Sequence, residues 1–181
     1  MKNIIDVIIN FIKTTSVEWW AIIFSVALGL FNIIYTSLKD IYKEKKEFDK
    51  NLFKKIIELW SYRDLMNFLD SLDNKFYNPD FFSDLDCLIN FISEPNSDFN
   101  NKKIDKIKEK LLKSLTELNI FLTEHFFRTG PLFALYPEHK NSIDSKLSSN
   151  YSKRSAELEK IINDCRKNIN IFFKNCQKIS N

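Results

Sequence analysis

The sequence predicts an all-α protein, with a single N-terminal transmembrane helix followed by a cytoplasmic antiparallel helical bundle. Residues 19–38 contain no charged side chain, and twenty helical residues rise about 30 Å, the thickness of a bilayer's hydrocarbon core. The 181 residues include only 2 Gly and 4 Pro, so β-hairpins and glycine-rich phosphate loops are not expected. Two long segments in the second half repeat apolar residues at the helical period, as the helices of a bundle do.

Residues 1–16 are predicted to form an amphipathic lead that lies in the membrane plane. Their first part, MKNIIDVIINFIK, is apolar except on one face, which carries Asn3, Asp6, Asn10 and Lys13. A helix of this pattern, too short to span, rests at the membrane surface. Packing against the span of a neighbouring copy is compatible with this position. Residues 14–16 interrupt the lead, and Ser16 can cap the next helix.

Residues 17–38, VEWWAIIFSVALGLFNIIYTSL, are predicted to be the transmembrane helix. Trp19 and Trp20 mark one end and Tyr35 lies near the other, where aromatic residues meet the membrane interface. The alternative, a core helix of a soluble bundle, is disfavoured because such helices keep a charged stripe. Lysines are more numerous after the span than before it. The positive-inside bias therefore places the C-terminal domain in the cytoplasm of a bacterial inner-membrane protein.

One face of the span collects small and polar residues within a narrow arc: Glu18, Ala21, Ser25, Gly29, Asn32, Thr36 and Lys39. Small residues let membrane helices approach closely, and polar side chains form hydrogen bonds across the contact. Asn32 is the strongest signal, because a lipid-facing amide would leave several hydrogen-bonding groups unpaired. Three interpretations remain open: pore lining or packing between copies, packing against another protein, and hydroxyls that bond their own backbone with no further role.

Residues 39–181 are predicted to form the cytoplasmic bundle. The mixed-charge segment 39–51 continues as a helix, and apolar residues recur after it at Phe48, Leu52, Ile56, Leu59 and Trp60. Ser61 and Asp64 form a capping-box pattern that starts a helix ending near Leu72. Asn78-Pro79 starts another, which residues 94–97 end. Long helices are expected over 101–128, stopped by Gly130-Pro131, and over 148–178, with an irregular segment at 131–146 between them.

No catalytic, metal or cofactor site is predicted, and the chain is not expected to be an enzyme. The two histidines, His125 and His139, lie in no HExxH or paired-cysteine pattern. Glu124 and His125 could form an acid–base pair, but a structural, hydrogen-bonded histidine is the favoured interpretation. The three cysteines are unclustered, and we expect them to be reduced, with Cys165 packed on an apolar helix face: Cys87, Cys165 and Cys176.

Four lysines line one face of the 101–128 helix: Lys103, Lys106, Lys110 and Lys113. They could contact phosphates. Asp105 and Glu109 dilute the positive charge and no aromatic residue interleaves it, so a solvated face is favoured and nucleic acid is not an expected partner.

This architecture, with an in-plane lead, one span bearing a polar stripe and a helical bundle, resembles the small membrane accessory proteins of type VI-B CRISPR systems. The resemblance covers the full length in architecture and size. It implies a HEPN-like helical domain on a membrane span that assembles into a pore and strengthens phage defence. HEPN ribonucleases carry Arg and His separated by four to six residues. Here ten residues separate Arg128 from His139, so a working nuclease is not expected.

We therefore expect an oligomeric pore protein that permeabilises or depolarises the inner membrane in antiviral defence. Its expected partners are the lipid membrane and further copies of the chain. The alternative is a membrane-tethered helical interaction module, which recruits a cytoplasmic protein partner without conduction.

Overall fold

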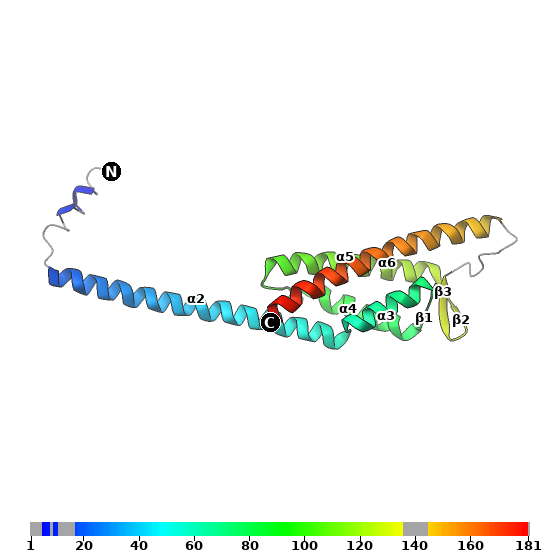
Figure 1. Ribbon diagram of the computed structural model, residues 1–181, viewed down its shortest axis with the longest axis horizontal. Coiled ribbons are helices and arrows are strands. Elements are labelled where there is room, and N and C mark those ends of the chain that lie inside the picture. The colour runs from blue at the N-terminus through cyan, green and yellow to red at the C-terminus, as the bar shows by residue number, and fades with distance from the viewer. Residues whose placement is uncertain (1–4, 8, 11–16, 136–144, 181) are drawn as a thin grey trace. The chain divides into compact units, whose positions relative to one another are not determined.

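The computed structural model describes residues 5–7, 9–10, 17–135 and 145–180. Within these residues the chain is mostly helical, with one long apolar helix near the N-terminus and a small sheet (Figure 1). The helices are α2 (Val17–Leu59), α3 (Tyr62–Asp73), α4 (Pro79–Ser93), the 3-10 turn η1 (Pro95–Ser97), α5 (Lys102–His125) and α6 (Ser145–Ser180). The strands are β1 (Phe76–Tyr77), β2 (Phe126–Thr129) and β3 (Leu132–Leu135). The chain divides into two compact units, Met1–Glu44 and Lys45–Asn181.

The first unit holds the predicted lead and the apolar part of α2. Residues 5–7 and 9–10 are helical. The rest of the predicted lead, including the interruption at 14–16 and the Ser16 cap, lies outside the described residues. α2 begins at Val17 as predicted.

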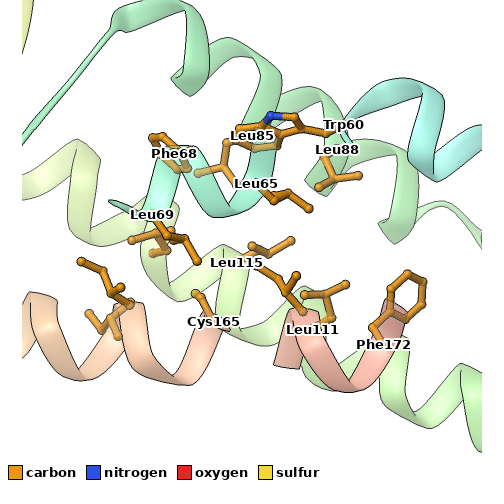
Figure 2. Packing of buried hydrophobic residues seen from close by; sticks show 14 of the residues in the cluster. Trp60, Leu65, Phe68, Leu69, Leu85, Leu88, Leu111, Leu115, Cys165 and Phe172 are labelled. Carbon is orange, nitrogen blue, oxygen red and sulfur yellow. The ribbon is translucent and has the colours of Figure 1, made fainter. Parts of the chain in front are cut away.

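The second unit is mostly helical and also contains the small sheet. α5 and α6 form its most extensive helix pair, and Figure 1 shows them running in opposite directions. Two hydrogen bonds mark this register: Cys165 Sγ donates to the Ser114 carbonyl at 3.2 Å, and Asn168 Nδ2 donates to the Lys110 carbonyl at 3.5 Å. α3 packs on α6 and α4 on α5, which encloses one core of Leu, Ile and Phe side chains (Figure 2).

Side-chain caps start the helices of the bundle where the sequence indicates. Ser61 Oγ accepts a hydrogen bond from the Asp64 backbone N–H at 3.2 Å, and Asn78 Oδ1 accepts one from Asp80 at 3.1 Å. Each bond satisfies a backbone donor that the first turn of a helix leaves without a partner. The predicted starts of α3 and α4 are confirmed.

The expectation of no β-hairpin is wrong. β2 and β3 form an antiparallel hairpin that closes at Gly130, whose φ of 65° is the left-handed conformation favoured by glycine. β1 adds to β3 on the far side from β2, so the strand order is β1-β3-β2. The predicted 101–128 helix therefore ends at His125, and part of the predicted irregular segment is strand β3.

Burial of aromatic rings explains the sheet. The Tyr77 ring stacks on Phe133, its register partner in β3, with ring centroids 5.3 Å apart and planes 10° apart. Tyr77 also lies against Phe126, with ring centroids 5.2 Å apart. Placing these rings on one face of a sheet buries them against the helices. α6 then begins at Ser145, inside the segment that was expected to be irregular.

Candidate membrane-spanning segment

The first part of α2 is long and apolar enough to cross a bilayer, judged by length and composition. None of its apolar window is buried by the described part of the chain. Leu28, Phe31 and Ile33 are 54%, 68% and 65% exposed. Soluble monomers seldom expose contiguous apolar surface on this scale. The exposed surface therefore calls for a cover of lipid or of other chains.

The polar-face residues predicted from the sequence all occur on this helix. Ala21, Ser25, Gly29, Asn32, Thr36 and Lys39 are exposed members of α2 at spacings of three or four residues. Successive members of such a series share one face of an α-helix. The structure describes only the backbone of Glu18, which lies in the first turn of α2.

The two hydroxyl groups of this face already have partners within the helix. Ser25 Oγ donates to the Ala21 carbonyl at 2.8 Å, and Thr36 Oγ1 donates to the Asn32 carbonyl at 2.8 Å. Such bonds to the preceding turn satisfy Ser and Thr in apolar surroundings. In this structure, the hydroxyl groups of Ser25 and Thr36 therefore bond to the backbone of their own helix.

Asn32 differs from its neighbours on the face. Its side-chain amide forms no hydrogen bond to the residues that the structure describes, and it is exposed. In hydrocarbon an amide without partners costs several kcal/mol. Gly29, one turn away, has open space where a Cβ would lie. Among the uncharged polar side chains of this face, Asn32 is thus the one whose donors and acceptor are all unengaged within the described chain.

Sequence reasoning missed a buried acid on the C-terminal part of α2. Asp49 is 3% exposed, and its carboxylate meets the start of α5. Its Oδ1 accepts from Asn100 N–H at 2.7 Å and Asn100 Nδ2 at 3.3 Å, and its Oδ2 accepts from Asn101 N–H at 2.9 Å. A carboxylate at a helix N-terminus also interacts favourably with the helix dipole. The i, i+3, i+4 spacing of Asp49 with the core residues Leu52 and Phe53 was the available signal.

A lysine in the first half of α5, Lys108, is also buried. Its side chain is 4% exposed, and its Nζ donates to the Ser97 carbonyl at 3.1 Å and to Asp98 Oδ1. The ammonium group holds the pKa of the Asp98 carboxyl below its usual value, mainly through that hydrogen bond and secondly through its charge. The four lysines predicted to form one solvated face of this helix are exposed: Lys103, Lys106, Lys110 and Lys113.

Arg166 and the two buried cysteines have structural roles in the bundle. Arg166 on α6 forms ion pairs with Asp70 and Asp73 on α3, with N–O distances of 2.6 and 2.5 Å. Burial raises the pKa of the Cys165 and Cys176 thiols to about 12, whereas Cys87 is exposed. The predicted packing of Cys165 on an apolar helix face is confirmed.

His125 packs against an aromatic ring instead of forming the expected hydrogen bond. Its ring meets Phe121 edge-to-face with centroids 4.6 Å apart, and its buried Nδ1 has no hydrogen-bond partner among the residues described. Its Nε2 lies 3.8 Å from the Glu124 carboxylate. His139 lies outside the described residues. Within residues 5–7, 9–10, 17–135 and 145–180, no three His, Cys, Asp or Glu side chains group as metal ligands would.

Comparisons with protein-family models, curated proteins and solved structures found no match to this chain.

Proposed function

We propose that this chain is a single-span protein of a bacterial inner membrane whose spans associate into an oligomeric pore. The pore would permeabilise or depolarise that membrane. The observation that carries the proposal is the apolar part of α2, which is fully exposed and carries one amide, Asn32, without a hydrogen-bond partner in the described chain.

A bilayer is the cover that suits this surface. The uncharged run of residues 19–38 is about 30 Å long as a helix, which matches the hydrocarbon thickness. Trp19 is 61% exposed at one end and Tyr35 is 58% exposed near the other, positions at which both rings reach the interface. The lysines that follow Leu38 favour a cytoplasmic location for the second unit.

Association of the spans would give the side chains of the polar face hydrogen-bond partners. Hydrocarbon offers the Asn32 amide no partner, whereas a second helix or a water-filled lumen does. Because the described chain has one candidate span, the second helix must come from another molecule. A further copy of the chain is always present and brings the same amide.

Helix dimensions permit a lumen when enough copies assemble. Helices with a radius of about 5 Å, spaced about 8–10 Å apart, leave a hole of about 2 Å radius in a ring of four and about 7 Å in a ring of eight. The larger hole admits hydrated ions. The resemblance to accessory proteins of type VI-B CRISPR systems supplies a biological setting, in which depolarisation limits phage growth.

The particle mass of the full-length protein in detergent tests the proposal first. A ring of about seven or more copies leaves room for hydrated ions by the same helix dimensions, and such a particle should release ions from vesicles. A monomer or dimer, or a larger ring that leaves vesicles sealed, would contradict the pore.

A membrane-tethered interaction module is the second candidate. The observation in its favour is that the Ser25 and Thr36 hydroxyls bond their own helix, which reduces the polar lining available to a pore. Replacing residues 17–38 by an unrelated apolar span separates the two functions. A tether would keep its cellular activity after this exchange, whereas a pore would lose it.

A further inference from the structure

A row of lysines follows the apolar part of α2. Its five members are all exposed: Lys39, Lys43, Lys46, Lys50 and Lys54. At 100° per residue they fall within an arc of about 80°, so they form one stripe along the helix. We call these five residues the lysine stripe. The two other lysines of this stretch, Lys45 and Lys55, point about 140° away from the centre of the stripe, on either side.

The lysine stripe continues the polar face of the apolar segment. From Ser25 to Lys54 the members follow one another at intervals of three or four residues, passing through Asn32 and Thr36. Within α2 both sets share an arc of about 100°. From Ser25 to Thr36 this face is polar and uncharged. From Lys39 onward it carries the five lysines, with one acid, Glu47, at the edge of the arc.

Little within the described part of α2 neutralises the lysine stripe. Lys54 Nζ lies 3.8 Å from the Glu58 carboxylate, with both side chains mostly exposed, and such a pair contributes little. The other four stripe lysines have no carboxylate within ion-pair distance among the residues described. Asp49 is occupied by the three donors at the start of α5.

We infer that the lysine stripes of several copies form cationic rings at the cytoplasmic mouth of the proposed pore and make it prefer anions. This inference rests on the pore proposed above. If Asn32 faces the lumen, Lys39 and Lys43 on the same helix face must also turn toward the axis. Rings of lysine select anions in other pores, because the converging field raises the local anion concentration. Glu18, in the first turn of α2, and Glu47, at the edge of the arc, supply two negative charges against the stripe's five positive charges.

The charge pattern also favours a ring over a close pair of helices. Two helices in contact along this face would have axes about 8–10 Å apart, which brings the two lysine stripes together. Like charges at such positions are destabilising. A wider ring keeps the ammonium groups apart and hydrated. Headgroup binding, the other use of juxtamembrane lysines, gives no reason for the stripe to align with Asn32.

Ion selectivity of the full-length protein in vesicles tests the inference. The protein is reconstituted in phosphatidylcholine vesicles, and the reversal potential is measured across a potassium chloride gradient. The stripe variant Lys43→Gln/Lys46→Gln is compared with Lys45→Gln/Lys55→Gln, which removes the same charge from other faces of α2. We expect a chloride-to-potassium permeability ratio above one in the wild type. The ratio should fall toward one in the stripe variant and stay unchanged in the control.

The outcomes separate the inference from the function on which it rests. A wild-type protein that conducts no ions would overturn the pore and the inference together. A conducting protein whose selectivity is the same in both double variants would overturn the inference alone. A third outcome would also overturn the inference: added phosphatidylglycerol changes conduction by the wild type but not by the stripe variant, while both keep the same chloride preference. The lysines would then serve the headgroups.

Discussion

Asp49 shows how one side chain holds two segments of the second unit together. Its buried carboxylate accepts hydrogen bonds from three donors of Asn100 and Asn101, just where α5 begins. Asp49 itself is 3% exposed, and a buried carboxylate without such donors would be expensive. The residue therefore holds the segment that leads into α5 against the C-terminal part of α2, about fifty positions away in the sequence.

Truncating this carboxylate should destabilise the protein. Asp49→Ala leaves three donors without their acceptor, and we expect a loss of about 2–3 kcal/mol in unfolding free energy, or about 5–10 °C in Tm. Thermal unfolding followed by circular dichroism in detergent measures the loss. Glu47→Ala, which removes an exposed acid from the same helix, is the control. Equal melting curves for the two variants would argue against this stabilising contact.

Asp98 and Lys108 should make part of the stability dependent on pH. Because Lys108 lowers the pKa of Asp98 in the folded protein, the pair stabilises the fold above the carboxyl group's unfolded pKa. That contribution disappears as the pH falls through the folded pKa. We expect Asp98→Asn to lower the Tm at about pH 7 and to approach the wild type at about pH 3. A Tm difference that is constant over this interval would show that the charge of Asp98 is irrelevant.

At the scale of the element, α2 carries two kinds of polar residue in its apolar part. The hydroxyls of Ser25 and Thr36 donate to carbonyls of the preceding turn. An asparagine amide has two donors and one acceptor, and Asn32 has none of them engaged within the described chain. Association between spans should therefore depend on Asn32 far more than on the two hydroxyls.

Substitution of Asn32 should therefore weaken association more than substitution of Ser25 or Thr36. Asn32→Leu is expected to weaken self-association in detergent by about 1–2 kcal/mol per contact, the usual size of an interhelical hydrogen bond in a membrane. In cells it should reduce depolarisation. Ser25→Ala and Thr36→Val should change both readouts little, because their hydroxyls already have partners. Particle mass at several protein concentrations measures the association, and unchanged depolarisation in Asn32→Leu cells would count against a lumen-facing amide.

At the scale of the whole molecule, the second unit is held by one continuous core. Phe68 of α3, Leu88 of α4, Leu111 of α5 and Phe172 of α6 are each 2% exposed or less and belong to the same cluster (Figure 2). The core encloses Cys165 and Cys176 but leaves Cys87 at the surface. Thiol chemistry can therefore report whether the whole unit is folded.

Cysteine labelling should distinguish the folded unit from the unfolded chain. Burial raises the pKa of Cys165 and Cys176 to about 12, so at neutral pH both are protonated as well as inaccessible. A maleimide at about pH 7 should modify Cys87 alone in the native protein and all three thiols in denaturant. Mass spectrometry counts the adducts, and rapid native labelling of Cys165 would contradict the closed core.

The starts of several elements and most of the core-facing residues could be predicted from short stretches of sequence. Ser61 and Asn78 cap α3 and α4 through donors two or three residues away, and the i, i+3, i+4 recurrence identified Leu111, Leu115 and Leu118 as buried. Periodicity also pointed to Phe48 and Leu59, which are 47% and 44% exposed. The helical repeat identifies which face of a helix is apolar. Residues at the edge of that face, however, lie outside the area that neighbouring elements cover.

The sequence by itself determined the apolar run of residues 19–38 and the placement of its polar residues on one face. A helix needs only local hydrogen bonds, and its repeat is a property of the backbone. Only the tertiary structure decided that residues 126–129 leave the helical pattern for a sheet, and that Asp49 and Lys108 are buried. Those outcomes depend on Tyr77, whose ring packs against Phe126, on Asn100 and on Ser97, partners that a local pattern does not bring together. An acid or lysine is tolerated in a core, and a phenylalanine run becomes a strand, only when the fold supplies the matching hydrogen bonds and rings.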